Sequence, residues 1–289
     1  MENILEIKGL KKEYKDFSLH DISFSLPMDC ITGFIGVNGA GKTTTLKAIL
    51  NLIPKESGSV QIFGMDMDTN EKAIKERIGI VLDDGGFYDE LNLSEMKSII
   101  ASAYKSWDEL EYKKYLDRFS LNPKQKISTL SKGMRMKYAL ALALSHKAEL
   151  LIMDEPTSGL DPLIRSQLLD ILKEFMAKGG HGVFFSTHIT SDLDKIADML
   201  IMIDGGRIVF QEEKDILLDN YRIVKGDIKD LNSDTEQLFL NIDKTSFGFT
   251  AITKHTDKVK KQIPNIIVER PTIEDIMLSN IKDLLRKVK

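Results

Sequence analysis

The sequence contains very little cysteine, no long apolar run and no excess of basic charge. With Cys30 as its only cysteine, the chain cannot form an intrachain disulfide. The apolar residues around Cys30 favour burial over reactivity, so we expect a reducing, cytoplasmic environment. The most apolar stretches, YALALALSH and MLIMID, are much shorter than the roughly 20 residues that cross a bilayer. If the protein works at a membrane, we expect another subunit to span it.

The charge balance excludes a second group of functions. A net charge of -4 and a pI near 5.8 give no bulk attraction to nucleic acid or acidic lipid. The length of 289 residues, with 42% hydrophobic and 29% charged residues, is typical of a globular protein with one large domain or two smaller ones. A polyanionic ligand would therefore have to bind at a local site.

The order of strand-like and helical patterns predicts an α/β fold. Apolar, β-rich runs occur at residues 4–7, 22–26, 31–35, 59–63, 78–82, 150–153, 182–186, 199–203 and 208–210, with helical patterns between several of them. Strand patterns stop from about 84 to 145, where helical patterns at 93–104, 108–119 and 131–144 predict an inserted helical subdomain. The pattern changes again after Tyr221, so we predict a main domain over 1–221 and a small α+β domain over 222–289.

The segment GVNGAGKTTTL, residues 36–46, matches a phosphate-binding loop in the expected context, after an apolar strand and before a helix. Its glycines let backbone N–H groups converge on an anion at the helix N-terminus. Lys42 is expected to reach the β and γ phosphates, and the Thr43 hydroxyl to ligate Mg2+. The alternative is a glycine-rich turn that fits the pattern by chance. The predicted nucleotide-binding residues of this loop are Gly36, Asn38, Gly39, Ala40, Gly41, Lys42, Thr43 and Thr44.

A second motif, LLIMDEPTSGLDP at 150–162, predicts a buried strand that ends in two carboxylates. At the edge of a parallel sheet, Asp154 would support Mg2+ directly or through water, and Glu155 would polarise an attacking water. The alternative is that these acids only begin the next helix, where negative charge is favourable.

Together these motifs resemble the ATP-binding subunit of ABC transporters over roughly residues 1–220. Ser131, Lys132 and Gly133 stand in the position of the family's signature motif, and residues 158–161 resemble the loop that contacts the partner subunit. His188 resembles the family's switch histidine, and Tyr14 stands where the family stacks an aromatic ring on adenine. The ending at 269–282 is similar to that of bacterial exporter ATPases that carry a C-terminal extension.

The resemblance implies an ATPase cassette with an antiparallel β subdomain, an inserted helical subdomain and a head-to-tail dimer around two Mg-ATP. Lys42, Glu155 and His188 would be its catalytic residues, with Glu155 as the base and His188 holding the γ-phosphate and the water. Hydrolysis would drive a separate transmembrane permease at the cytoplasmic face of the membrane, for export of drugs or amphipathic peptides. The second ATPase subunit could be an identical or a different chain, and no nucleic acid is expected as a partner.

The sequence departs from the family pattern at Asp83, where most members carry Gln, and at Lys132 in the signature. Asp83 can bind Mg2+, and Lys132 of the opposite subunit could bring positive charge toward the same nucleotide. Independent drift at two tolerant positions explains both equally well. Phe87 and Tyr88 follow the Asp83 segment and are candidates either for a permease contact or for burial in the helical subdomain.

Two other classes of function remain as alternatives. The first is a soluble ABC ATPase that acts on nucleic acid or the ribosome, but the sequence lacks the long coiled coil or second cassette that such proteins usually have. The second is a module that binds ATP without turnover, which Glu155 and His188 disfavour.

Overall fold

The computed structural model describes residues 2–83 and 86–288. Its centre is a six-stranded sheet in the order β10-β9-β3-β8-β7-β6. All neighbouring strands are parallel except β10, which pairs antiparallel with β9. The strands are β3 (Ile31–Ile35), β6 (Ile78–Val81), β7 (Leu150–Asp154), β8 (Gly182–Thr187), β9 (Met199–Asp204) and β10 (Arg207–Glu213). Every residue of β3, β7 and β8 is buried, as expected for strands covered on both faces.

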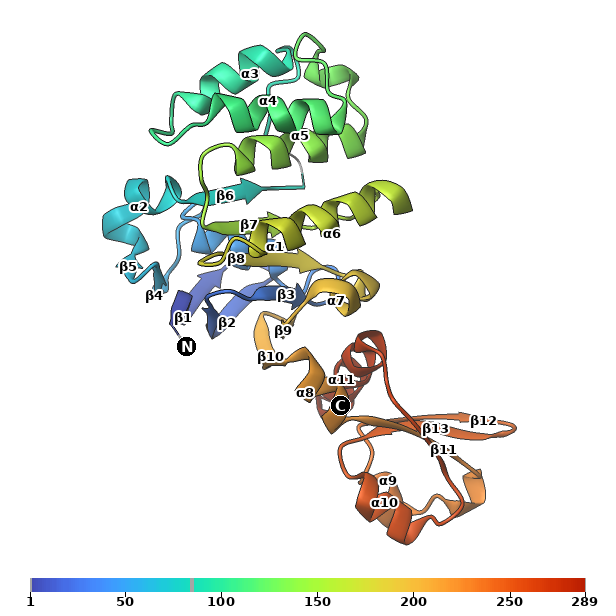
Figure 1. Ribbon diagram of the computed structural model, residues 1–289. Coiled ribbons are helices and arrows are strands. Elements are labelled where there is room, and N and C mark those ends of the chain that lie inside the picture. The colour runs from blue at the N-terminus through green and yellow to red at the C-terminus, as the bar shows by residue number, and fades with distance from the viewer. Residues whose placement is uncertain (1, 84–85, 289) are drawn as a thin grey trace.

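Helices and a second sheet cover the two faces of the central sheet (Figure 1). One core cluster joins the central sheet to an antiparallel sheet of order β2-β1-β4-β5, and within it Phe34 and Phe184 pack 5.4 Å apart. The elements of these layers are β1 (Asn3–Glu13), β2 (Ser18–Pro27), β4 (Ser57–Ile62), β5 (Met65–Asp66), α1 (Lys42–Ile49), α2 (Met67–Lys75), α6 (Pro162–Met176) and α7 (Thr190–Ile196). The arrangement is the predicted α/β cassette with an antiparallel β subdomain.

The helical subdomain lies beyond β6, at one end of the molecule (Figure 1). It contains α3 (Leu93–Ala101), α4 (Glu109–Phe119), the 3-10 turn η1 (Ile127–Thr129) and α5 (Lys132–Leu144). Asn92, Asp108 and Ser131 cap the three α-helices by accepting backbone N–H hydrogen bonds. Helix α5 also packs on β6, which attaches the subdomain to the central sheet.

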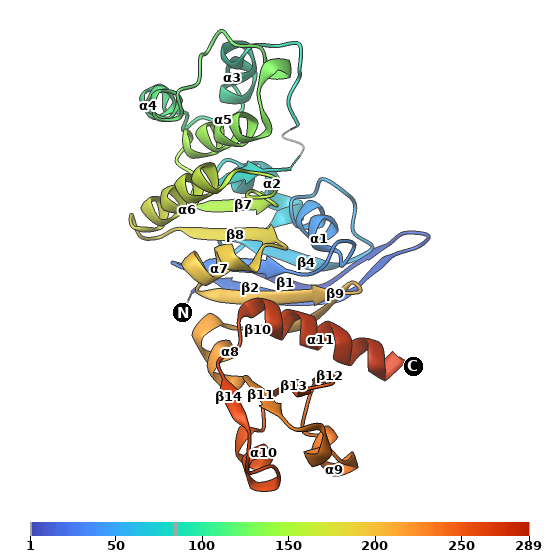
Figure 2. The ribbon, with the colours of Figure 1, turned by 90° about the vertical axis from the view of Figure 1, so that its right-hand side faces the viewer.

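Residues after α8 (Lys214–Asn220) form a sheet of order β12-β13-β11-β14 at the opposite end of the molecule (Figure 2). Its elements are β11 (Arg222–Gly226), η2 (Ile228–Asp230), α9 (Ser233–Glu236), β12 (Asn241–Thr245), β13 (Gly248–Thr253), α10 (Thr256–Gln262), β14 (Ile267–Glu269) and α11 (Ile273–Val288). A small core of its own includes Val224, Phe249 and Val259. Helix α11 packs on α7, and Ile273 and Ile276 belong to the main core, so this region is anchored to the cassette.

Within residues 2–83 and 86–288, no helix combines the length and the apolar character that crossing a bilayer requires.

Candidate nucleotide-binding site

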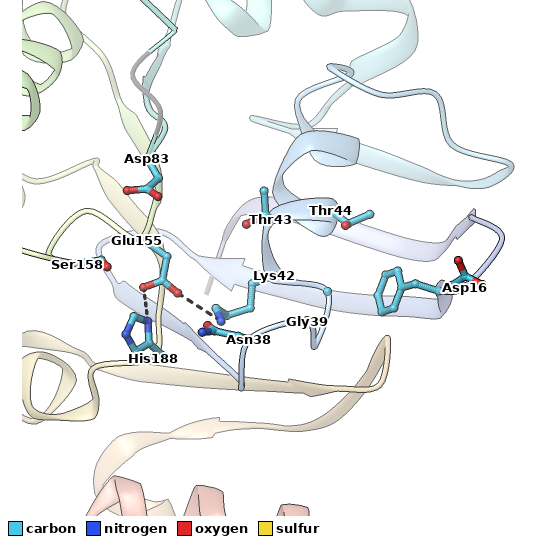
Figure 3. Close-up of a pocket in the computed structure, with 12 residues that line it drawn as sticks. Asp16, Asn38, Gly39, Lys42, Thr43, Thr44, Asp83, Glu155, Ser158 and His188 are labelled. Atoms are coloured by element: carbon cyan, nitrogen blue, oxygen red, sulfur yellow. Dashed lines mark hydrogen bonds and ion pairs between the residues drawn. The ribbon is translucent and has the colours of Figure 1, made fainter. Parts of the chain in front are cut away.

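The site lies where β3, β7 and β8 end. Because these neighbouring strands are parallel, the loops that follow them meet at one edge of the sheet. The loops and the β1–β2 turn surround an open pocket of about 630 Å³ (Figure 3), a size that suits a nucleotide. Its lining residues are Asp16, Phe17, Asn38, Gly39, Gly41, Lys42, Thr43, Thr44, Asp83, Glu155, Ser158 and His188.

The glycines of the loop after β3 serve different purposes. Gly39 and Gly41 have φ angles of +82° and +114°, which residues other than glycine rarely adopt. Gly36 is required by space, because a Cβ there would lie 2.4 Å from the Ile203 carbonyl oxygen. Gly41 caps α1 without a side-chain hydrogen bond, so the first-turn N–H groups of α1 have no side-chain cap, and the first three residues of α1 line the pocket. These donors at a helix N-terminus fit the phosphates of a nucleotide.

Lys42 is buried and is held by oxygen atoms on several sides. Its Nζ donates to the carbonyl oxygens of Gly36 (2.8 Å) and Val37 (3.3 Å). The same Nζ lies 3.3 Å from Glu155 Oε1. The lysine charge is therefore placed inside the loop and balanced by one carboxylate.

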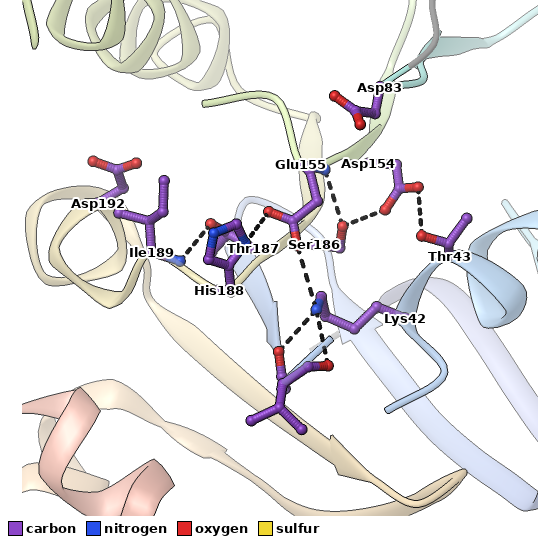
Figure 4. A network of polar contacts seen from close by, with 12 residues as sticks. Lys42, Thr43, Asp83, Asp154, Glu155, Ser186, Thr187, His188, Ile189 and Asp192 are labelled. Carbon is purple, nitrogen blue, oxygen red and sulfur yellow. Dashed lines mark hydrogen bonds and ion pairs between the residues drawn. The ribbon is translucent and has the colours of Figure 1, made fainter. Parts of the chain in front are cut away.

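Asp154 and Thr43 form the part of the site that suits a magnesium ion (Figure 4). The Thr43 hydroxyl donates to Asp154 Oδ2 (2.7 Å), and the Ser186 hydroxyl donates to Asp154 Oδ1 (2.5 Å). Asp154 is buried and Asp83 lines the pocket nearby. A hydroxyl and two carboxylates supply only oxygen donors, the set that Mg2+ prefers when phosphates and waters complete its shell.

Glu155 has an unusual backbone conformation, and its side chain lines the pocket. Its φ of +48° is in the left-handed region, and its N–H donates to both the carbonyl (3.1 Å) and the hydroxyl (3.0 Å) of Ser186. These bonds offset the strain of a non-glycine residue at positive φ. The carboxylate then lies between Lys42 and His188, whose Nδ1 is 2.7 Å from Glu155 Oε2 (Figures 3 and 4).

The structure thus brings together Asn38, Gly39, Gly41, Lys42, Thr43, Thr44, Asp83, Glu155 and His188 around one pocket. Gly36, Ala40 and Asp154 are among the predicted residues that do not line it. Ala40 is buried, and its carbonyl accepts the Gly206 N–H (2.9 Å) behind the loop. Sequence reasoning missed Asp16, Phe17 and Ser158; the last belongs to a loop that was identified only as a partner contact.

The aromatic side chain that lines the pocket is Phe17, whereas Tyr14, the residue predicted to stack on adenine, does not line it; the adenine contact of Tyr14 stays a prediction. Tyr14 is 48% exposed and does not line the pocket. Strand β1 ends at Glu13, and the turn that follows is closed by a hydrogen bond from the Tyr14 N–H to the Phe17 carbonyl (2.8 Å). Lys12 lies 5.2 Å from the Tyr14 ring centre, so Tyr14 packs with the strand's own lysine. A second aromatic three residues after Tyr14 was the signal available in the sequence.

Ser131, Lys132 and Gly133 lie at the start of α5 and do not line this pocket. Ser131 Oγ accepts the Met134 N–H (3.2 Å) as the helix cap. Gly133 is buried, and a Cβ there would lie 2.7 Å from Ile164 Cδ1, so packing against α6 requires a glycine. Lys132 Nζ is 2.8 Å from Asp83 Oδ1 of the same chain. The two side chains therefore already form an ion pair within one chain, and the hypothesis that Lys132 of an opposite subunit acts at the same nucleotide stays a prediction.

A second, apolar pocket of about 250 Å³ lies between β6 and the helical subdomain. Phe87 lines it and packs on Tyr138, with ring centres 5.2 Å apart, whereas Tyr88 is 65% exposed. Phe87 is therefore packed within the helical subdomain, and Tyr88 is available for contact with another protein. At the base of the pocket, burial lowers the pKa of His146 and raises that of Tyr104, and the two rings stack.

A family model described as ABC transporter matches residues 19–158. The bacitracin transport ATP-binding protein of Enterococcus faecalis is 32% identical over 212 residues, which cover 72% of this chain and 69% of the relative. The linearmycin resistance ATP-binding protein of Bacillus subtilis is 33% identical over 216 residues, 71% of this chain and 68% of the relative. A solved structure of an ATP-binding subunit of an ABC transporter matches 75% of this chain and 92% of its own, with 30% identity and a TM-score of 0.68. The chain belongs to the family of ABC transporter ATP-binding subunits, which are ATPases.

Proposed function

We propose that this chain powers an exporter of amphipathic peptides or drugs, as a homodimer bound to a permease on the cytoplasmic face of the membrane. The names of the relatives support the cargo class, because bacitracin and linearmycin are the compounds for which they are named. The contact of Glu155 with both Lys42 and His188 is the observation that carries the ATP-hydrolysing role.

The pocket residues account for nucleotide binding. The free N–H groups of α1 and the Lys42 ammonium bind the phosphates, and Phe17 packs against the adenine ring. Thr43, Asp154 and Asp83 would hold Mg2+, which neutralises charge that develops on the phosphates. Lys42 must exchange Glu155 Oε1 for phosphate oxygens, and this exchange frees the carboxylate for its next task.

Glu155 is then the base that orients and deprotonates water. Its side chain is 14% exposed, so the released carboxylate is shielded from bulk solvent but open to the pocket. His188 contacts it at 2.7 Å and keeps it directed at the position of the γ-phosphate. The left-handed backbone conformation of Glu155 also directs its carboxylate into the pocket.

A head-to-tail dimer explains why the signature residues lie outside their own pocket. The pocket is open on one side, while Ser131 and Lys132 are exposed at the N-terminus of α5. That helix end can meet the γ-phosphate in the pocket of a second copy. One chain carries both the loop residues and the signature, so two identical chains complete two sites.

The apolar pocket beside Phe87 is the proposed contact for the permease. Its lining residues come from β6 and the helical subdomain, and this subdomain lies at the end of the molecule opposite the sheet of residues 222–289 (Figure 2). Exposed Tyr88, which follows the pocket-lining Phe87 in the chain, and the apolar side chains of the pocket suit a short helix from a membrane subunit. Residues 1–221 then act as the cassette, and residues 222–289 form an accessory domain directed away from the membrane.

The test is co-expression of the tagged chain with candidate permease subunits from the same genome. We expect the two to co-purify in detergent, and ATPase activity of the complex to rise with amphipathic peptide and to vanish in Lys42→Ala. Replacing Phe87 and Tyr88 with Ala should weaken the association and leave ATP binding intact. Leu110→Ala, at an exposed apolar residue of α4, is the control. A chain that purifies alone, with activity indifferent to peptide, would contradict the exporter role.

A further inference from the structure

Lys132 contacts two other functional segments of its own chain. Its Nζ lies 2.8 Å from Asp83 Oδ1, at the segment that follows β6. The same side chain crosses the loop of residues 158–161, because a Cβ on Gly159 would lie 3.4 Å from Lys132 Cδ and 3.6 Å from Nζ. Lys132, at the start of α5, thus contacts both the loop before α6 and the Asp83 carboxylate of the pocket.

Asp83 therefore has two competing partners. It lines the nucleotide pocket, where a carboxylate could serve Mg2+, and at the same time one of its oxygens is bound by Lys132. Lys132 itself is the first residue of α5, where the positive end of the helix disfavours a cation. A carboxylate partner relieves that cost. An anion that approaches the helix end can take the place of the carboxylate.

The ion pair is exposed enough to exchange. The Lys132 and Asp83 side chains are 45% and 50% exposed, and a solvated pair of this kind is weak. The phosphates of a nucleotide carry several negative charges and would displace a single carboxylate. The contact is therefore suited to form in the open chain and to break in a closed one.

We propose that Lys132 is a positioning residue that couples the two nucleotide sites of the dimer. In the free chain it holds Asp83 and limits its use at the chain's own pocket. When the signature faces the nucleotide of a second copy, Lys132 moves to that phosphate and releases Asp83 to the magnesium site of its own pocket. This coupling rests on the proposed dimer, whereas the hold on Asp83 within one chain does not.

The hold within one chain is tested with nucleotide binding, without turnover. Binding of fluorescent ADP to the chain is measured as Mg2+ is added, at protein concentrations where the chain is a monomer. Lys132→Met should lower the half-saturating Mg2+ concentration by about two- to fivefold, the range expected for loss of an exposed ion pair. Lys124→Met, which removes an exposed lysine of the same subdomain, should not change it.

A double-mutant cycle separates the ion pair from general electrostatics. In the Asp83→Asn background, Lys132→Met should have no further effect, because the partner is already absent. The same shift in both backgrounds, or an unchanged half-saturating Mg2+ concentration in Lys132→Met alone, would overturn the positioning role.

The coupling is tested by the dependence of ATPase rate on ATP. The unsubstituted chain should give a Hill coefficient above 1, and Lys132→Met should give a value near 1. Equal coefficients in the two proteins would overturn the coupling. Whether ATP forms a dimer is measured separately by light scattering, so a missing dimer refutes the proposed assembly and with it the coupling, while the Mg2+ titration still decides the hold on Asp83.

Discussion

The substitution Glu155→Gln should change nucleotide binding and hydrolysis in opposite directions. In the free chain, Glu155 Oε1 lies 3.3 Å from Lys42 Nζ, and Oε2 lies 2.7 Å from His188 Nδ1. Glutamine keeps the shape of the side chain and removes its charge. The variant therefore loses both the base and the group that competes with phosphate for Lys42.

The size of each effect follows from these contacts. Two charges 3.3 Å apart attract by about 5 kcal/mol at an effective dielectric constant near 20, before solvation is subtracted. Desolvation and the residual glutamine hydrogen bond cancel most of that, which leaves about 1 to 2 kcal/mol. ATP should then bind roughly 5 to 30 times more tightly. Loss of a general base should lower the hydrolysis rate by about 10² to 10⁴.

Binding is measured by calorimetry with Mg-ATP, and the chemical step by single-turnover hydrolysis. Glu111→Gln on α4, which does not line the pocket, is the matched control and should alter neither quantity. Weaker ATP binding in Glu155→Gln would refute the competition for Lys42. A hydrolysis rate above a tenth of the original would refute Glu155 as the base.

Three further predictions concern the surroundings of the site. In the described part of the chain, Asp192 is fully buried with no hydrogen bond to its carboxylate, and its ion-pair partner is Arg165 Nε at 3.8 Å. Arg165→Met should therefore lower the free energy of unfolding of the chain by about 3 kcal/mol. A loss under about 1 kcal/mol in urea unfolding would contradict this. Burial lowers the pKa of His146, so the folded chain binds this proton less readily than the unfolded chain, and stability should be complete above the ordinary value of 6.5 and fall as pH drops below it. Melting curves of His146→Gln should show a flatter dependence between pH 7 and 5.5, and an identical slope would refute the assignment. Phe17→Ala should weaken ATP binding about tenfold while Tyr14→Ala leaves it within twofold, as measured by calorimetry, and the reverse order would identify Tyr14 as the adenine contact.

Sequence patterns were most informative where one local rule applied. The buried strands β3, β7 and β8 begin where their apolar runs begin, and the three predicted helices of the subdomain match α3, α4 and α5 to within a few residues, since caps define their starts. Strand β1 runs from Asn3 to Glu13, well beyond its apolar run at 4–7. Its second half pairs with β2 in a hairpin and with β4, and the pairing with β4 joins residues far apart in the sequence, which local hydrophobicity does not record.

The site shows the same division. Lys42, Thr43 and Glu155 were predicted because a motif fixes their spacing and their chemistry. Whether Tyr14 or Phe17 lines the pocket depends on the tight turn after β1, and the partner of Lys132 depends on how the helical subdomain packs beside β6. Both outcomes depend on tertiary geometry. The sequence therefore contains the candidate residues but does not determine which ring lines the pocket or which carboxylate contacts Lys132.

The central claim is that ATP in this pocket closes two copies of the chain and that hydrolysis opens them. Light scattering of Glu155→Gln with saturating Mg-ATP tests it most directly, because the closed state cannot be lost to turnover. We predict a particle of twice the 32.7 kDa chain mass that returns to one chain when ADP replaces ATP. A particle that stays at 32.7 kDa with ATP shown to be bound would contradict the account.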